Sequence, residues 1–352
     1  MTNKHLPHDL AQMQSLPLEA KIIMTQQRIR QWYEYWDGQV YICFSGGKDS
    51  TVLKHIIDSM YDDVPALFVN TGLEYPEIQK FVKDIKSGKY DCFNSDVEII
   101  RPEMRFDEVV KKYGYPVASK ELSRKIYYAK RGSKWAEKFV DGTASFNGKK
   151  SRYVISKRFL PLMEAPFEVS PFCCNVMKKT PAAKYEKQSR RKPFLGVLAD
   201  ESDIRKQAWI RTGCNSFEGK KPQSKPLSFW TEQDILHYLK KYEVPYCEVY
   251  GGIVVSSEDC INSGQTTIYD VLNDYEGAKL TTTGCDRTGC IFCMFGCHLE
   301  KEPNRFQRLK QTHLRQYEYC INGGEMVDGK WQPNKEGLGL GKVLDYIGVK
   351  YD

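Results

Sequence analysis

The sequence predicts an α/β fold, a parallel sheet covered by helices, followed by a C-terminal extension that carries cysteines. Three observations lead to this prediction. Short apolar runs alternate with segments of helical periodicity, polar glycine-containing segments follow several of these runs, and closely spaced cysteines appear beyond residue 251, where the alternation stops. Strands that alternate with helices are typical of a parallel sheet buried on both faces.

The elements of this sheet are expected in a regular order. Residues 1–37 are predicted to be helical, and because Pro7 and Pro17 interrupt the pattern, we expect a short leading segment and then a helix from about Leu18. The expected strands are 39–44, 64–69, 97–100 and 194–198, and the expected helices after the first two strands are 49–61 and 75–85. Ligands of such sheets bind at the carboxyl ends of the strands.

Two segments depart from this pattern. Residues 118–160 are rich in Lys, Arg and Tyr and are interpreted as a basic insertion, with a loop at 142–150, in a sheet domain that spans 38–250. Residues 251–352 form the predicted extension, with a helix near 304–319 and a glycine-rich tail.

Composition narrows the class of protein. Of 352 residues, 41% are hydrophobic and 28% charged, which is ordinary for a globular protein. No apolar run approaches the ~20 residues of a membrane helix, and the N-terminus lacks the apolar region of a secretion signal. We therefore expect a cytoplasmic protein with no membrane partner. The net charge of +7 suits a polyanionic partner, whether a phosphate-bearing substrate or a nucleic acid.

The strongest single motif is Ser45-Gly-Gly-Lys-Asp-Ser50, between an expected strand and an expected helix. Glycines let backbone N–H groups approach phosphate oxygens, and the helix N-terminus presents unpaired donors and a positive dipole end. Lys48 adds a cation, and Ser45 and Ser50 add hydroxyl groups. Asp49 is expected to cap the helix or to help place Mg²⁺. The motif predicts a phosphate-binding loop, although it lacks the Walker spacing.

The segment Phe44–Thr51 resembles the signature of the PP-loop ATP pyrophosphatases, and the chain as a whole resembles the phosphoadenosine phosphosulfate (PAPS) reductase family. Further stretches that carry this resemblance, in the same order and over roughly residues 38–250, are Asn70–Pro76, Gly196–Arg205, Pro226–Ile235 and Val244–Tyr250. The resemblance implies an adenine nucleotide alpha hydrolase-like fold. It also implies that ATP or a related adenine nucleotide is the ligand.

The resemblance assigns further residues to the nucleotide site. It places Asn70, Thr71 and Gly72 beside the nucleoside, and Glu201 and Arg205 at the mouth of the site. Two positions depart from the family pattern: Asn70 stands where the family usually has Asp, and Leu198 stands where Arg is common. These departures leave open whether the nucleotide is ATP or a sulfonucleotide.

Cysteines suggest a metal site. Cys173 and Cys174 are adjacent, and far downstream Cys285, Cys290, Cys293 and Cys297 follow at short spacings. The arrangement resembles the iron-sulfur adenylylsulfate reductases, and also the DNA-phosphorothioation enzymes. The resemblance implies a [4Fe-4S] cluster on Cys173, Cys174, Cys290 and Cys293, with Lys178 nearby. The rival assignments are a zinc knuckle made by the four downstream cysteines, a mixture of the two groups, and buried thiols without metal.

The preferred activity is cleavage of ATP between its α and β phosphates, which adenylates an acceptor in support of sulfur transfer. Lys48, Asp49 and Glu201 are the candidate catalytic residues, and the backbone of Gly46 and Gly47 is expected to stabilise the leaving pyrophosphate. The resemblance to tRNA and DNA thiolation enzymes, together with the basic stretch 118–160, makes a nucleic acid a candidate acceptor. A protein that donates sulfur or electrons is a further candidate partner.

Two alternatives remain open. A sulfonucleotide reductase needs a nucleophilic cysteine. In this family that cysteine lies in a C-terminal Cys-Gly-x-His sequence, whereas Gly337–Gly348 contains no cysteine. Cys320 is the substitute that remains. The second alternative is a nucleotide-binding regulatory module with a structural zinc site and no turnover.

Overall fold

The computed structural model describes residues 4–219, 221–256 and 277–352. Residue contacts divide the chain into two compact units. The first unit contains 1–70, 74–101 and 182–288, and the second contains 71–73, 102–181 and 289–352. The domain boundaries expected from the sequence, at 37/38 and 250/251, stay predictions.

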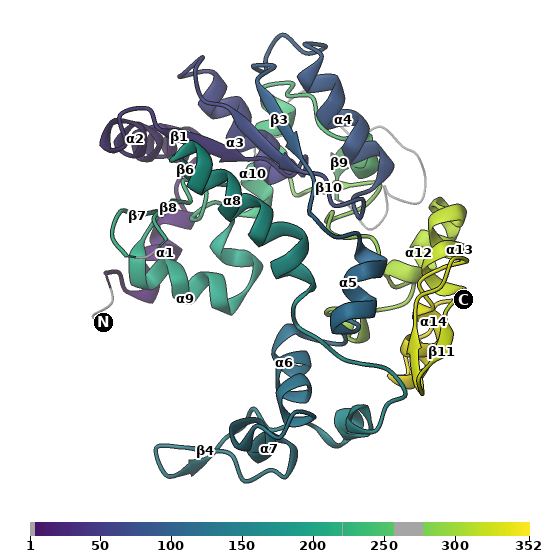
Figure 1. Ribbon diagram of the computed structural model, residues 1–352. Coiled ribbons are helices and arrows are strands. Elements are labelled where there is room, and N and C mark those ends of the chain that lie inside the picture. The colour runs from purple at the N-terminus through teal and green to yellow at the C-terminus, as the bar shows by residue number, and fades with distance from the viewer. Residues whose placement is uncertain (1–3, 220, 257–276) are drawn as a thin grey trace. The chain divides into compact units, whose positions relative to one another are not determined.

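The first unit is built on a six-stranded sheet with the strand order β3-β2-β1-β6-β8-β7 (Figure 1). All neighbouring pairs are parallel except β7 with β8. Successive strands β1, β2 and β3 extend the sheet in one direction, and β6, β8 and β7 extend it from the other side of β1. Strand order therefore reverses at β1, and a parallel sheet binds its ligand at such a reversal. The strands are β1 Val40–Cys43, β2 Ala66–Val69, β3 Val97–Ile100, β6 Lys192–Leu195, β7 Asn215–Ser216 and β8 Gln223–Ser224.

Alternation along β1 explains how the sheet is buried on both faces. Val40 and Ile42 belong to the large apolar core, whereas Tyr41 packs with Leu67 and Tyr185 in a smaller cluster. Successive side chains of a strand point to opposite faces, so both faces of β1 are covered. Tyr185 comes from α8, which places that helix on the face opposite the large core.

Figure 1 shows the helices that accompany these strands. They are α1 Pro7–Gln14, α2 Leu18–Tyr35, α3 Lys48–Asp58, α4 Pro76–Lys86, α8 Thr180–Ser189, α9 Asp203–Thr212 and α10 Glu232–Lys241. The buried Lys21 of α2 pairs with Asp234 of α10 at 2.8 Å, and Trp230 Nε1 donates to Thr25 Oγ1 at 2.9 Å. These contacts fix the start of α10 against α2. The short elements are η3 Ala199–Glu201, η4 Glu248–Tyr250, β9 Ile253–Val255 and β10 Leu280–Thr282.

The second unit is mainly helical. Tyr115 pairs with Val169 and Ala118 with Phe295 in isolated parallel bridges, which tie its segments from distant parts of the sequence together. Its helices are α5 Phe106–Tyr113, α6 Lys120–Ala129, α7 Lys134–Val140, α12 Arg305–Thr312, α13 Leu314–Ile321 and α14 Leu340–Tyr346. Its shorter elements are β4 Ser145–Phe146, β5 Lys149–Lys150, η1 Lys157–Met163, η2 Asn175–Lys179, η5 Cys297–Leu299, β11 Glu325–Val327 and β12 Lys330–Gln332.

The predicted fold class is confirmed: a mostly parallel sheet lies among helices, and the C-terminal region carries cysteines. Three local expectations need correction. The helix expected near 304–319 is two helices, because His313 leaves the helical region at φ −139° and ψ 61°. The expected loop at 142–150 contains the antiparallel β4–β5 pair, and the glycine-rich tail contains α14.

Candidate functional site

The predicted phosphate loop lies at the carboxyl end of β1, where the strand order reverses. Gly46 has a φ of +72°, in the left-handed region that favours glycine, and a Cβ there would lie 2.9 Å from Ile78 Cγ2. Gly47 is the N-cap residue of α3. A Cβ on Gly47 would lie 3.2 Å from both Tyr250 Oη and Thr288 Oγ1. The backbone of the loop is therefore packed closely against neighbouring side chains.

Two hydroxyl groups hold the turn together. Ser50 Oγ donates to the Gly47 carbonyl at 2.8 Å and shares a 3.0 Å hydrogen bond with Ser45 Oγ. The N–H of Gly47 donates to Ser45 Oγ at 3.4 Å. These bonds place both predicted serines at the loop and hold its turn together.

Lys48 is buried and is held by groups that come from distant parts of the sequence. Its Nζ forms an ion pair with Glu232 Oε1 at 2.7 Å and also donates to the Asp286 carbonyl. Its backbone N–H donates to Tyr250 Oη at 3.1 Å, and that hydroxyl shares a 2.6 Å hydrogen bond with Thr288 Oγ1. The cation predicted to meet phosphate is thus fixed at the loop.

Asp49 lies in a strongly cationic environment. Burial raises the pKa of its carboxyl, while the charges of Lys48, Arg287 and Arg205 oppose that rise. Its Oδ1 is buried and has no hydrogen-bond partner among the described residues. A buried carboxylate oxygen that accepts no hydrogen bond is a suitable ligand for Mg²⁺.

Glu201 and Arg205 face the loop from η3 and α9. Ser202 caps α9 by accepting from the Arg205 N–H. Glu201 pairs with Arg205 and also with Arg287, a residue that the sequence analysis did not identify. Burial and the neighbouring charge of Arg287 lower the pKa of Arg205. Two guanidinium groups therefore share one carboxylate beside the loop.

These residues line one cavity of about 200 Å³ in the first unit. It brings together most of the predicted phosphate-loop residues with Glu201 and Arg205. The lining residues are Ser45, Gly47, Lys48, Asp49, Ser50, Gly196, Glu201, Arg205, Tyr250, Arg287 and Thr288. Gly196 lies against the start of α3, since a Cβ there would be 2.9 Å from Ser50 Cα.

The sequence analysis missed four residues around this cavity: Glu232, Tyr250, Arg287 and Thr288. Glu232 and Tyr250 lie within stretches that carry the family resemblance, but nothing in those stretches indicates contact with Lys48. Arg287 and Thr288 lie between Cys285 and Cys290, where the cysteines dominate the interpretation. The basic, hydroxyl-bearing sequence Asp-Arg-Thr-Gly was the available signal.

The residues predicted to lie beside the nucleoside, Asn70, Thr71 and Gly72, follow β2 in the chain. Asn70 follows β2, and its N–H donates to the Ile100 carbonyl at 2.8 Å. Thr71 is buried and its Oγ1 accepts from the Leu73 N–H at 3.1 Å. None of Asn70, Thr71 and Gly72 is among the described residues that line the phosphate cavity. Their role beside the nucleoside stays a prediction.

The four cysteines of the predicted cluster share one neighbourhood within the second unit. Burial raises the pKa of the Cys173 thiol, and the thiols of Cys290, Cys174 and Cys293 raise it further, against a smaller opposing effect of Lys178. Cys174 precedes η2, a single π-helical turn of a kind that is frequent at functional sites. Within the described residues, however, no three His, Cys, Asp or Glu side chains are arranged ready to hold one metal ion.

Other cysteines have different surroundings. Cys297 is buried, its Sγ donates to the Met294 carbonyl at 3.0 Å, and burial raises its pKa to about 12. Cys285 belongs to the first unit, where its N–H donates to the Val249 carbonyl. Burial raises the pKa of Cys320 well above its usual value, so this thiol is not activated as a nucleophile.

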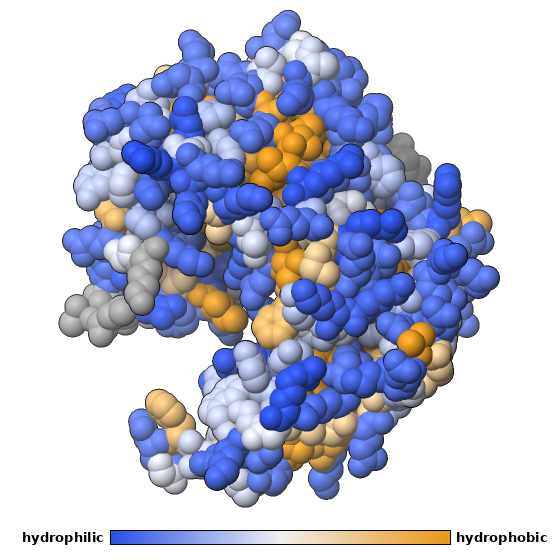
Figure 2. Space-filling model, viewed as in Figure 1, coloured by the Kyte–Doolittle hydropathy of each residue, from blue (hydrophilic) through white to orange (hydrophobic). Residues whose placement is uncertain are grey.

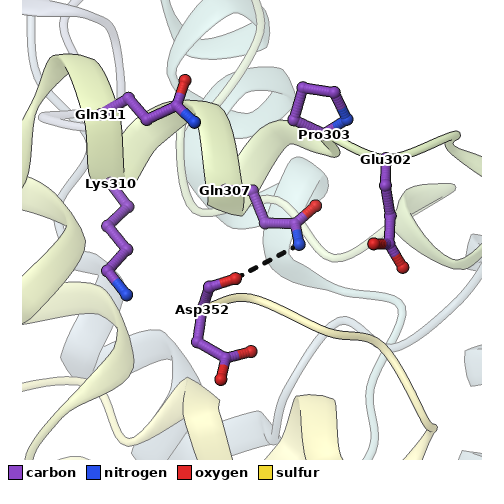
Figure 3. Close-up of a pocket in the computed structure, with 6 residues that line it drawn as sticks. All are labelled: Glu302, Pro303, Gln307, Lys310, Gln311 and Asp352. Atoms are coloured by element: carbon purple, nitrogen blue, oxygen red, sulfur yellow. Dashed lines mark hydrogen bonds between the residues drawn. The ribbon is translucent and has the colours of Figure 1, made fainter.

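A second, more open cavity of about 380 Å³ lies beside α12 (Figure 3). Glu302, Pro303, Gln307, Lys310, Gln311 and Asp352 line it. Gln307 Nε2 donates to the Asp352 carbonyl at 3.3 Å across it. Its lining mixes both signs of charge, and none of the residues predicted from the sequence lies there. Separately, no helix among the described residues has the length and apolar character required to cross a membrane.

Comparison with known proteins adds to this geometry. Residues 39–150 and 162–294 match the phosphoadenosine phosphosulfate reductase domain family. A phosphoadenosine 5'-phosphosulfate reductase of Photobacterium profundum is 24% identical over 237 residues, covering 67% of this chain and 73% of that protein. A solved structure, the PAPS reductase of Candida auris in a phosphate complex, has 14% identity and a TM-score of 0.38, covering 70% of this chain and 90% of its own.

Two uncharacterised proteins of Methanocaldococcus jannaschii are also similar. They are 32% identical over 123 residues and 33% identical over 91 residues, or 34% and 25% of this chain. The chain matches only 24% and 21% of their lengths. The family match itself spans more than half of the chain and includes the phosphate loop. This chain therefore belongs to the phosphoadenosine phosphosulfate reductase domain family.

Proposed function

We propose that this chain cleaves ATP between the α and β phosphates and uses the adenylated acceptor for sulfur transfer. The observation that carries the proposal is the cavity at the strand reversal, where Lys48, Arg205 and Arg287 surround the glycine loop. A cationic pocket with backbone donors suits a polyphosphate, and it can stabilise the charge of a departing pyrophosphate.

The reaction needs two displacements. An acceptor oxygen attacks the α-phosphorus, the bond from that phosphorus to the α,β-bridging oxygen breaks, and pyrophosphate carries away the bonding electrons. A sulfur nucleophile then attacks the activated centre of the acceptor, and AMP leaves with the acceptor oxygen. The chain's contribution is to hold the polyphosphate in place and to stabilise charge on the leaving group.

Individual residues have distinct roles in this proposal. Lys48 and the N–H groups of Gly46 and Gly47 bind the phosphates, with the hydroxyls of Ser45 and Ser50 beside them. Asp49 would hold Mg²⁺ through its Oδ1, which has no protein partner among the described residues. Mg²⁺ supplies neutralisation of phosphate charge when it is bound. Glu201 and Arg205 lie at the mouth, and Asn70, Thr71 and Gly72 are proposed to contact the nucleoside.

The direct test is Lys48→Ala, with Lys80→Ala on the exposed face of α4 as the matched control. We expect the Lys48 variant to lose at least ~100-fold in pyrophosphate release from ATP, because it loses a charge-assisted phosphate contact. Circular dichroism should show an unchanged fold. Turnover equal to that of the Lys80 control would contradict the phosphate assignment.

The alternative reaction is reduction of a sulfonucleotide, which is favoured by the family and by the name of the Photobacterium relative. Such a reductase would release sulfite rather than pyrophosphate. Assays of ATP, adenylylsulfate and PAPS side by side separate the two reactions. Binding of ATP without release of pyrophosphate would instead favour a regulatory module with a zinc site.

The four neighbouring cysteines support a metal cofactor, since four thiolates can hold a [4Fe-4S] cluster or a zinc ion. Cys173, Cys174, Cys290 and Cys293 would hold it, with zinc as the rival metal. Such a cluster supplies one-electron chemistry when it is bound. A partner protein that donates sulfur or electrons would complete the sulfur-transfer reaction.

A nucleic acid is the proposed acceptor. Its support is the basic arm, defined here as residues 118–160. Lys134, Lys138, Lys149 and Lys150 of this arm form no ion pair with other described residues, so their charges are available to phosphates. Trp135 is 42% exposed and Phe146 77% exposed. Cations beside exposed aromatic rings are typical of surfaces that bind single-stranded nucleic acid.

A further inference from the structure

The loop after β10 contributes three successive residues to the phosphate pocket. The carbonyl of Asp286 accepts from Lys48 Nζ, the guanidinium of Arg287 pairs with Glu201, and Thr288 Oγ1 bonds Tyr250 Oη at 2.6 Å. Tyr250 Oη in turn accepts from the Lys48 N–H at 3.1 Å. These contacts determine the position of the loop along the phosphate-binding turn, and Arg287 lies between the two anchored residues.

The charged groups of the pocket are not paired evenly. Glu232 pairs with Lys48 at 2.7 Å, whereas Arg205 and Arg287 both pair with Glu201. The Glu201 side chain is only 16% exposed, whereas those of Arg205 and Arg287 are 40% and 61% exposed. The mostly buried carboxylate of Glu201 therefore pairs with two guanidinium groups, and both of these remain accessible to a ligand.

Arg205 and Arg287 carry like charges that influence each other within the pocket. Burial and the charge of Arg287 both lower the pKa of Arg205, so the charged form of Arg205 is disfavoured while the pocket lacks a ligand. A phosphate oxygen between the guanidinium groups would relieve this repulsion. Arginine is well suited to this role because its planar fork binds phosphate through two hydrogen bonds.

We infer that Arg287 and Arg205 form a second anion subsite, which takes a phosphoryl group beyond the one held by the glycine loop, and that Glu201 is the internal counter-ion which this group replaces. The inference rests on the proposed nucleotide site and deepens it. It makes the pocket selective for ligands that carry at least two linked phosphoryl groups, namely a nucleoside triphosphate or pyrophosphate, over a nucleoside monophosphate.

The test is calorimetric binding of ATP, pyrophosphate and AMP to the full chain. The buffer should contain EDTA, because Mg²⁺ would itself neutralise phosphate charge. Arg287→Gln should weaken ATP and pyrophosphate by ~10- to 100-fold, the usual effect of losing hydrogen bonds to a charged group, and AMP by less than ~3-fold. Arg211→Gln is the matched control, because this exposed arginine lies on α9, the helix of Arg205, but does not line the pocket.

For Glu201→Gln we expect pyrophosphate affinity to rise, whereas for Arg287→Gln we expect it to fall. Removal of the counter-ion leaves both guanidinium groups available, so this variant should bind pyrophosphate ~3- to 10-fold more tightly than the unaltered chain. A purely structural role of the Glu201 pairs predicts the reverse: weaker binding of all three ligands together with a lower melting temperature.

The outcomes separate this inference from the proposed function. If Lys48→Ala abolishes binding of ATP while Arg287→Gln leaves the ratio of pyrophosphate to AMP affinity unchanged, the subsite is wrong and the nucleotide site stands. If the unaltered chain binds neither ATP nor pyrophosphate, both are overturned. A selective loss in Arg287→Gln, together with tighter binding in Glu201→Gln, supports the subsite.

Discussion

Gly196 determines how closely the end of β6 approaches the phosphate-binding helix. Its φ is not in the left-handed region, so its requirement is steric: a Cβ would lie 2.9 Å from Ser50 Cα and 3.0 Å from the Asp49 carbonyl oxygen. Both neighbours are backbone atoms of α3, which cannot move without displacing the loop. The glycine is therefore needed for the approach of two elements rather than for a turn.

We predict that Gly196→Ala lowers the free energy of unfolding by about 1–3 kcal/mol, the usual cost of overpacking. Nucleotide affinity should fall as well, since the start of α3 must shift. Gly252→Ala is the matched control, because its nearest neighbour, Thr283 Oγ1, lies 4.0 Å from the added Cβ. Urea denaturation gives the free energy of unfolding of both variants. Equal values would show that the end of β6 and α3 can move apart without loss of stability.

Residues of the site differ in how well the sequence reveals them. Ser45, Gly47, Lys48 and Ser50 form one continuous motif between a strand and a helix, so their chemistry could be predicted together. Arg287 reaches the same cavity from a loop far downstream. Its place depends on packing between distant segments, which the sequence Asp-Arg-Thr-Gly around it does not reveal by itself.

At the scale of elements, periodicity identified the strands better than the C-terminal helices. Strand 97–100 agrees with β3 at both ends, and the expected strand 194–198 overlaps β6 at Lys192–Leu195. The predicted helix near 304–319 is interrupted at His313. The glycines around α14 resemble a loop composition, but packing of Leu340, Val343 and Leu344, all fully buried, overrides their low helix propensity.

The β4–β5 hairpin is the element of the basic arm that we propose to contact a nucleic acid. It pairs Phe146 with Lys149 and Ser145 with Lys150, and its residues are exposed. Figure 2, viewed as Figure 1, shows a small apolar patch among hydrophilic atoms near the hairpin. Phe146 and Lys149 share one face of the hairpin, so the ring can stack on a base while Lys149 meets an adjoining phosphate, and Lys150 adds charge on the other face.

We predict that Lys149→Glu with Lys150→Glu weakens binding of a single-stranded oligonucleotide by at least ~10-fold. The plot of log affinity against log salt should also become less steep, by ~1.4 in slope. Phe146→Ala should weaken binding by about 1–3 kcal/mol with little change in that slope. Fluorescence anisotropy over a salt series measures both effects.

The matched control for the hairpin is Lys83→Glu with Lys301→Glu, which changes the net charge equally at exposed positions outside the arm. Equal losses in the two double variants would mean that net charge alone attracts the nucleic acid. The hairpin would then have no specific role, and the acceptor proposal would lose its structural support.

At the scale of the whole molecule, sequence neighbours and spatial neighbours differ. The second unit combines residues 102–181 with residues 289–352, and this brings Cys173 and Cys174 together with Cys290 and Cys293. Cys285 is only five positions before Cys290, yet it belongs to the first unit. The spacing of the downstream cysteines alone favours a local knuckle, whereas the division of the chain favours the long-range set.

We predict that serine at any of Cys173, Cys174, Cys290 and Cys293 reduces iron and sulfide from about four each per chain to near zero, with loss of absorption near ~400 nm. Serine at Cys285 or Cys297 should leave both contents unchanged. The reason is that Cys297 Sγ already bonds the Met294 carbonyl, and Cys285 lies outside the unit that contains the other four. Anaerobic purification followed by metal analysis of the six variants provides the measurement.

The pattern across these variants distinguishes the metal sites more sharply than the metal content of the unaltered chain. Loss of metal in the Cys285 and Cys297 variants, with retention in those of Cys173 and Cys174, would identify the local zinc knuckle and remove the main support for sulfur chemistry. Serine is close to cysteine in size, so we expect each variant to fold. Circular dichroism of each variant checks this. Because Cys173 and Cys290 come from separate parts of the sequence, loss of iron in both variants would also mean that the cofactor joins the two segments of the second unit, and chelation should then lower the melting temperature of the whole chain.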